Sequence, residues 1–189
     1  MLHYNAHILS IQAYKPPLVG RVSGGDHLLD FNERDEPLPQ VILDTLAEWV
    51  RRGNSIRYPD YTGFGEELER STGQPVSRLF WGNGSDQLIE CMLRIVVKPG
   101  ARVLLPAPSF AMYDLYARLV DADVATYSML ESDPFEQLGL KLKEKATELV
   151  IICNPNNPTG HPFDHQRILD KVRSHPHTWF LVDEAYGEF

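Results

Sequence analysis

Apolar and polar positions follow two different spacings along most of this chain. From residue 79 onward, short apolar runs of strand length are separated by segments in which apolar residues recur every three or four positions. The apolar runs predict strands over 79–81, 102–105, 124–128, 149–153 and 179–182. The periodic segments predict helices over 85–97, 113–120, 135–145 and 164–174. Alternating helices and apolar strands are typical of an α/β fold, in which helices cover both faces of a parallel sheet.

The first third of the chain has a different pattern. Residues 1–37 are polar and contain a Lys-Pro-Pro run at 15–17 and a Gly pair at 24–25, so we expect an arm with little core of its own. Helical spacing of apolar residues predicts a helix over 38–52, and a shorter helix over 64–71 follows. We therefore expect an amino-terminal arm, 1–37, followed by one domain, 38–189.

Charge balance and cysteine content narrow the class of protein. The 189 residues include 18 Lys and Arg against 26 Asp and Glu, a formal net charge of −8. This balance argues against nucleic acid as a partner, because phosphate binding needs a surplus of cations. The two cysteines, Cys91 and Cys153, form no paired motif, and no apolar run reaches the roughly 18 residues of a membrane helix. We expect a soluble, cytoplasmic protein that binds no membrane.

The segment 82–86 (GNGSD) joins a predicted strand to a predicted helix. Glycines allow a tight turn, and the start of the helix presents unpaired N–H groups and the positive end of its dipole, which suits a phosphate group. The alternative is a plain turn in which Ser85 or Asp86 caps the helix. Gln87 replaces the last glycine of a dinucleotide fingerprint, and no G-x-x-x-x-G-K-[ST] string occurs, so neither a dinucleotide site nor a P-loop is expected.

Two further polar loops follow apolar strands. The segment 154–160 (NPNNPTG) holds three asparagines, more than a simple connection requires. The segment 183–186 (DEAY) begins with an acid directly after the strand over 179–182. Such an acid is similar to the magnesium-binding acid of a Walker ATPase, which would need a P-loop, and the plainer alternative is an Asp that caps the next turn. Functional groups of parallel sheets gather at the carboxyl ends of the strands, so these loops are candidates for one site.

Six segments, in order and at similar spacing, resemble the fold-type I aminotransferases that use pyridoxal phosphate. They are 30–33 (DFNE), 57–60 (RYPD), 83–86 (NGSD), 107–110 (APSF), 156–160 (NNPTG) and 183–186 (DEAY). Within that family the likeness is strongest to histidinol-phosphate aminotransferases. The resemblance implies the aminotransferase large domain, a three-layer α/β sandwich with a mainly parallel sheet, and pyridoxal 5′-phosphate as the cofactor.

The resemblance implies roles for four residues at the cofactor ring. Asp183 stands where the family places the acid that keeps the ring nitrogen protonated, and this proton makes the ring an electron sink. Asn157 and Tyr186 match the hydrogen-bond donors to the phenolate oxygen of the ring. Phe110 matches the aromatic residue that stacks on the ring. Tyrosine is common there in relatives, so this chain keeps the stacking surface without the hydroxyl.

The resemblance also implies a phosphate site and a partner. The 5′-phosphate is expected on the backbone amides near Gly84, Ser85 and Asp86. In the family, the tyrosine that matches Tyr58 reaches the phosphate of the neighbouring subunit, which implies a homodimer. No metal site is expected, because the histidines near residue 161 lack a Cys or carboxylate that would complete a ligand set.

Transamination also needs a lysine that forms a Schiff base with the cofactor. In the family this lysine lies beyond the segment that matches 183–186, and no lysine of this chain stands in that context, so no catalytic lysine is assigned. We expect the chain to be the amino-terminal part of a longer enzyme, truncated within the large domain and without the small carboxyl-terminal domain. We expect it to be inactive alone. The alternative is a complete short protein that binds the cofactor weakly and cannot transaminate.

The resemblance implies a reaction as well. The expected activity is transamination of histidinol phosphate with 2-oxoglutarate, which forms glutamate and belongs to histidine biosynthesis. Threonine-phosphate decarboxylase, or another class I/II aminotransferase with an amino-acid or amino-phosphate substrate, shares these loops and stays an alternative. The alternative outside the enzymes is a non-catalytic cofactor-binding fragment.

Overall fold

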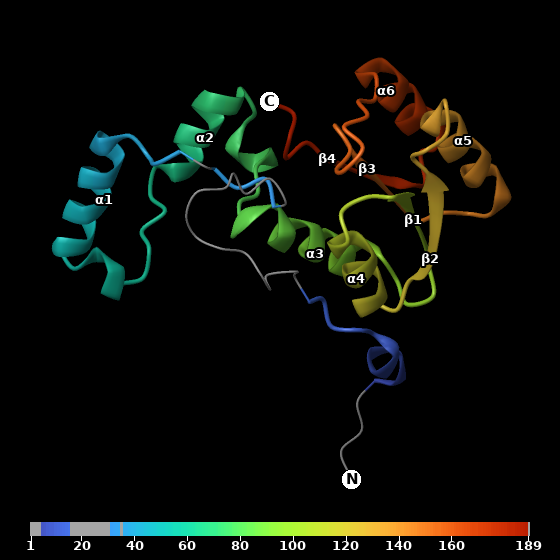
Figure 1. The fold of residues 1–189 in the computed structure, drawn as a ribbon, viewed down its shortest axis with the longest axis horizontal. Coiled ribbons are helices and arrows are strands. Elements are labelled where there is room, and N and C mark those ends of the chain that lie inside the picture. Colours follow the sequence, from blue (N-terminus) through green and yellow to red (C-terminus); the bar gives the residue numbers. More distant parts are fainter. Residues whose placement is uncertain (1–4, 16–30, 35, 189) are drawn as a thin grey trace, which may run out of the picture. The chain divides into compact units, whose positions relative to one another are not determined.

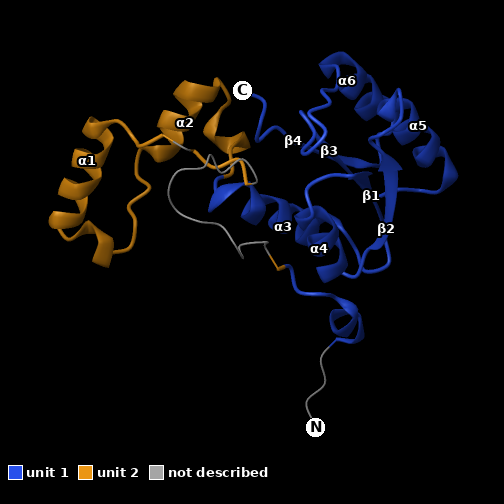
Figure 2. Ribbon diagram, in the orientation of Figure 1, with its two compact units in different colours: residues 1–14, 81–189 blue, residues 15–80 orange. Residues whose placement is uncertain are grey.

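The computed structural model describes residues 5–15, 31–34 and 36–188, and the chain divides into two compact units. Unit 1 comprises residues 1–14 and 81–189, and unit 2 comprises residues 15–80 (Figure 2). The predicted breakers at 16–17 and 24–25, and Asp30 of the first family segment, lie outside the described residues. The predicted boundary between residues 37 and 38 stays a prediction.

Unit 1 contains a parallel four-stranded sheet with the strand order β2-β1-β3-β4 (Figure 1). The strands are β1 (Arg102–Ala107), β2 (Asp123–Ser128), β3 (Leu149–Cys153) and β4 (Trp179–Asp183). They confirm four of the five predicted strands. Every residue of β3 is buried, because both faces of this central strand are covered, and this is why its sequence is a continuous apolar run.

Helices cover both faces of this sheet (Figure 1). They are α3 (Gly84–Val96) and α4 (Met112–Leu119) on one face, and α5 (Pro134–Glu144) and α6 (His165–Ser174) on the other. On β3, Ile151 packs with Leu93 of α3, whereas its neighbour Ile152 packs with Leu138 of α5. The fold is therefore the three-layer α/β sandwich that the sequence predicts, and each fully buried leucine or isoleucine contributes about 1.5–3 kcal/mol.

The predicted strand over 79–81 is wrong. The chain forms one 3-10 turn, η3 (Val76–Arg78), and then continues into the glycine turn without pairing with any strand of the described chain. A strand is stable only where a neighbour satisfies its backbone groups, and a three-residue apolar run carries too little periodicity to reveal whether one exists. Phe80 is 73% exposed, so its apolar side chain adds nothing to the core.

Unit 2 contains the two helices expected before residue 80. They are α1 (Gln40–Arg51) and α2 (Phe64–Thr72), with the one-turn helix η2 (Asn54–Ile56) between them. The apolar residues of α1 are nevertheless exposed, Val41 by 70% and Trp49 by 49%, and none of its side chains is buried within the described chain. None of the described helices combines the length and the apolar character needed to span a membrane.

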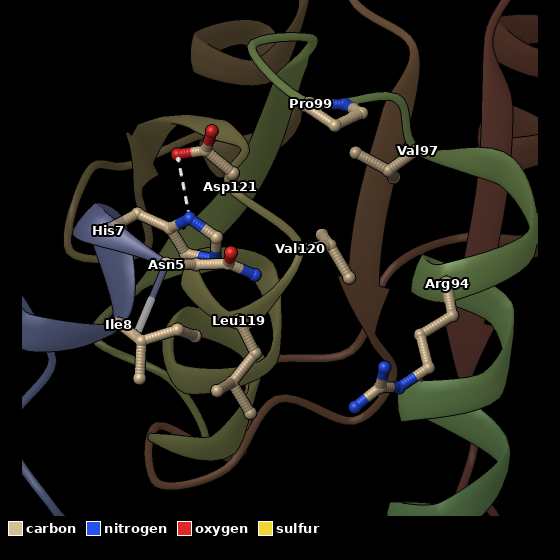
Figure 3. A pocket seen from close by; sticks show the side chains of 9 residues that line it. All are labelled: Asn5, His7, Ile8, Arg94, Val97, Pro99, Leu119, Val120 and Asp121. Carbon is tan, nitrogen blue, oxygen red and sulfur yellow. Dashed lines mark ion pairs between the residues drawn. The ribbon is translucent and has the colours of Figure 1, made fainter. Parts of the chain in front are cut away.

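A hollow on unit 1 lies at the amino ends of the strands (Figure 3). Its lining includes His7 of the one-turn helix η1 (Ala6–Ser10), Pro99 before β1, and Asp121 before β2. The Nδ1 atom of His7 lies 3.8 Å from Oδ1 of Asp121. Because the strands are parallel, this hollow is at the edge of the sheet opposite to the loops that carry the candidate chemistry.

Substitution of Leu138 tests the packing of α5 on the sheet. Leu138 is 0% exposed, so we expect Leu138→Ala to lower the free energy of unfolding by about 2–4 kcal/mol through lost burial and a cavity. Leu140 on the same helix is 48% exposed, and Leu140→Ala should cost less than about 0.5 kcal/mol. Urea unfolding measures both variants, and equal losses would contradict this packing.

Candidate functional site

The loops after β3 and β4 start side by side at the carboxyl edge of the sheet. Cys153, the last residue of β3, lies opposite Asp183, the last residue of β4. The Asn154 N–H donates to the carbonyl oxygen of Asp183 at 2.8 Å, which extends the pairing by one step. The loop after β1 reaches the same edge, since all strands run in one direction. This edge belongs to unit 1.

Two hydrogen bonds fix the side chain of Asp183. The hydroxyl of Tyr113 donates to Oδ2 at 2.6 Å, and the Ala185 N–H donates to Oδ1 at 3.1 Å. Burial raises the pKa of the Tyr113 phenol well above its usual range, and the bond to Asp183 adds to the rise. Tyr113 therefore stays a protonated donor, and the half-buried carboxyl of Asp183 is held in one orientation at the end of β4.

The glycine turn shapes the amino terminus of α3. Gly84, the first residue of the helix, has a φ of +75°, in the region that favours glycine. The Asn83 N–H donates to the side chain of Gln87, one turn into the helix. Ser85 and Asp86 lie inside the first turn, so the alternative in which one of them caps the helix is wrong. Asn83 occupies the cap position without a side-chain cap bond, which leaves first-turn amides to meet an anion.

Asp86 and Asp183 lie close enough to interact electrostatically. Partial burial raises the pKa of the Asp86 carboxyl, and the negative charge of Asp183 raises it further. Such an influence falls off with distance, so it requires the two carboxyls to be near each other. Helix α3 also contacts β4 directly. The amino terminus of α3 and the acid at the end of β4 therefore belong to one site.

Asn156 links the loop after β3 to the loop after β1. Its side chain is 1% exposed and uses both ends: Nδ2 donates to the carbonyl oxygen of Pro108 at 3.1 Å, and Oδ1 accepts from the Ser109 hydroxyl at 2.7 Å. Nδ2 also donates to the Thr159 hydroxyl at 2.8 Å. A buried amide with every group satisfied makes the loop rigid. Asn156 thereby fixes the backbone from which the next residue, Asn157, projects.

The other residues predicted to contact the cofactor ring also lie at the carboxyl edge of the sheet. Nδ2 of Asn157 donates to the hydroxyl oxygen of Tyr186 at 3.3 Å, so these two predicted partners of one ring oxygen are in contact. The ring of Phe110 meets the ring of Tyr113 edge-on, with centroids 5.5 Å apart and an interplanar angle of 84°. Through Tyr113, Phe110 is connected to Asp183.

Tyr58 is the one predicted site residue in the other unit. It lies in unit 2 just after η2, and its side chain is 100% exposed. Within unit 1 the described lysines that form ion pairs do so with acids outside the site: Lys98 with Glu148 and Lys141 with Glu144, for example. Across the described part of the chain, no group of three or more His, Cys, Asp and Glu residues is arranged to hold a metal ion.

Sequence reasoning missed three residues that organise this site. They are Gln87, Tyr113 and Asn156. Tyr113 stands three residues after Phe110, a spacing that puts two side chains on one face of a helical turn, and this signal could have found it. Asn156 could not be told from Asn157 by type, because only burial separates the amide that clamps the loop from the amide that faces the site.

Comparison with known proteins gives one family for the sequence. Residues 28–189 match the family model described as aminotransferase class I and II. The chain is 34% identical over 168 residues to the histidinol-phosphate aminotransferase of Caldanaerobacter subterraneus subsp. tengcongensis. This alignment covers 85% of this chain and 47% of that protein. The chain spans about half the length of the curated relatives that it matches.

Solved structures agree with the family model. The histidinol-phosphate aminotransferase of Sinorhizobium meliloti, solved in complex with pyridoxal-5′-phosphate, aligns with a TM-score of 0.72 and 25% identity over 80% of this chain and 42% of that one. The L-threonine-O-3-phosphate decarboxylase of Porphyromonas gingivalis aligns with a TM-score of 0.61 and 26% identity over 77% of this chain and 46% of that one. The family model takes in residues 28–189, well over half of the sequence, and the chain therefore belongs to the class I and II aminotransferase family.

Proposed function

We propose that the carboxyl edge of the unit 1 sheet binds pyridoxal 5′-phosphate, with the ring nitrogen at Asp183 and the phosphate at the amino terminus of α3. The observation that carries this proposal is the direct contact of helix α3, which begins at Gly84, with strand β4, which ends at Asp183. The influence of the Asp183 charge on the pKa of Asp86 agrees with this contact. Pyridoxal phosphate needs an acid for its ring nitrogen and a group of N–H donors for its phosphate, and the end of β4 and the start of α3 supply them. Phe110 adds an aromatic surface, and the Asn157–Tyr186 pair adds hydrogen-bonding groups for a ring oxygen.

When bound, this cofactor supplies an electron sink for charge that develops on the α-carbon of an amino substrate. The residues of the chain then have separate tasks. Asp183 holds a proton on the ring nitrogen, and the first amides of α3 hold the phosphate. The ring of Phe110 stacks on the cofactor ring and fixes its orientation. Among the described residues, none of the lysines is assigned to this site, so we propose no Schiff-base residue from this chain.

For the whole protein we propose transamination of histidinol phosphate with 2-oxoglutarate. The support is the 34% identity to one histidinol-phosphate aminotransferase and the similarity in fold to a second one. We also propose a cytoplasmic homodimer in which Tyr58 reaches the phosphate of the neighbouring subunit. The full exposure of the Tyr58 side chain is compatible with contact to a second chain.

Decarboxylation of threonine phosphate is the second candidate function. The 26% identity to the solved L-threonine-O-3-phosphate decarboxylase supports it. The two activities differ in their products. Histidinol phosphate has no carboxylate, so it cannot be decarboxylated, and its transamination transfers the amino group to 2-oxoglutarate, which becomes glutamate. Decarboxylation of O-phosphothreonine releases carbon dioxide and consumes no 2-oxoglutarate. Assays of the whole protein with each substrate separate the two candidates.

Substitution of Asp183 tests the proposed cofactor site. A hydrogen bond to a charged group contributes about 1.5–3 kcal/mol, so we expect Asp183→Asn to weaken pyridoxal phosphate binding by about tenfold to a hundredfold. The neighbouring acid Glu184 is exposed, and Glu184→Gln, the matched control, should change the affinity by less than about twofold. The measurement is a fluorescence titration of the purified chain with the cofactor. Equal affinities for Asp183→Asn and the parent would refute the site.

Substitution of Gly84 tests the phosphate end. Gly84 and Gly100 both have a φ of +75° with open space around them, so an alanine at either position costs about 1–2 kcal/mol of stability. Only Gly84 lies at the amino terminus of α3. We expect Gly84→Ala to reduce the preference for pyridoxal phosphate over pyridoxal by about threefold to tenfold, and Gly100→Ala to leave it unchanged.

Titrations of both variants with the two ligands give these preferences. The same loss in Gly100→Ala would show that the effect comes from general destabilisation. An unchanged preference in Gly84→Ala would remove the phosphate from the end of α3.

A further inference from the structure

Among the described contacts of Asp183, one hydrogen bond connects it to helix α4, and Tyr113 donates this bond. The side chain of Tyr113 is 1% exposed, and its hydroxyl lies 2.6 Å from Oδ2 of Asp183. The ring packs in the cluster between the sheet and the helices α3 and α4. A buried side chain in a packed core has one rotamer, so the position of its hydroxyl is fixed by the fold.

The two donors to Asp183 leave part of the hydrogen-bonding capacity of its carboxyl group unused. Tyr113 donates to one carboxyl oxygen and the Ala185 N–H to the other. A carboxyl group has about four lone-pair sites, so about two of those of Asp183 stay open among the contacts of the described residues. The two donors come from different elements, α4 and the loop after β4, and together they set the plane of the carboxyl group. The open lone pairs therefore have a defined direction.

We propose that Tyr113 is a positioning residue. It orients the carboxyl group of Asp183 toward the protonated ring nitrogen of the cofactor and does not contact that nitrogen itself. This inference rests on the proposed pyridoxal phosphate site. Phe110 strengthens the argument, because its ring lies edge-on to Tyr113 at 5.5 Å. One buried tyrosine thus supports both the acid and the aromatic surface that the proposed ring would meet.

The test compares two ligands that differ at a single ring atom. One is pyridoxal phosphate, and the other is its carbocyclic analogue, in which C–H replaces the ring nitrogen. The ratio of their affinities reports the interaction with Asp183 and cancels contributions from the phosphate and from stacking. We expect Tyr113→Phe to reduce the parent's preference for pyridoxal phosphate by about threefold to tenfold, since one hydrogen bond to the acid is lost.

Tyr127→Phe is the matched control. Tyr127 is also 1% exposed, and its hydroxyl donates to the carbonyl oxygen of Ile151 at 3.0 Å, within the cluster on the other face of the sheet. Both variants lose one buried hydroxyl bond, so urea unfolding should show that both are destabilised, and Tyr113→Phe more so because its bond is to a carboxyl group. The preference between the two ligands should change only in Tyr113→Phe.

The outcomes separate this inference from the proposed function. A parent chain that binds neither ligand, or binds both equally, refutes the proposed site itself. A parent that prefers pyridoxal phosphate while Tyr113→Phe keeps that preference, or loses affinity for both ligands alike, overturns the role of Tyr113 alone. If Tyr113→Phe does not fold, a chain with 3-fluorotyrosine at position 113 decides. Its hydroxyl is a stronger donor, so an unchanged ratio overturns the inference and an altered ratio supports it.

Discussion

The parallel pairing of β3 with β4 is the constraint on which the site depends. It sets Cys153 opposite Asp183, so the amide-rich loop and the acid leave the sheet at adjacent points. The hydrogen bond from Tyr113 then holds the acid, at the cost of burying a phenol whose pKa rises as a result. A shift of β4 by one residue would turn Asp183 to the opposite face of the sheet and separate it from Tyr113.

The polar side chains at the carboxyl edge of the sheet differ in how well their hydrogen-bonding groups are satisfied. Asn156 is buried yet bonded at both ends of its amide, which makes its burial tolerable and its loop rigid. Asp86 has no such relief, because burial and the charge of Asp183 both disfavour its ionised form. The acid at the end of β4 is suited to a cation, and the amino terminus of α3 is suited to an anion. Pyridoxal phosphate combines both.

Much of the fold of unit 1 follows from the sequence, because its apolar runs and helical spacing coincide with buried strands and helix faces. The strand over 149–153 is an example, since its five apolar residues are all buried. The strand expected over 79–81 failed because pairing depends on a neighbour that a short run does not reveal. The predicted site residues of unit 1 stand at the first turn of α3, at the end of β4 and in loops, where hydrophobic periodicity gives no signal, and motif likeness alone suggested them. Tyr113 and Asn156 escaped because their importance lies in contacts across 70 and 47 positions of the chain, respectively.

The state of the ring nitrogen tests the central claim most directly. Pyridoxal phosphate labelled with ¹⁵N in the ring is bound to the chain, and its ¹⁵N chemical shift is measured at a pH above that at which the free cofactor loses its ring proton. If Asp183 meets this nitrogen, the bound ring keeps its proton and shows the shift of a pyridinium. A bound ring with the shift of a neutral pyridine at that pH would contradict the account.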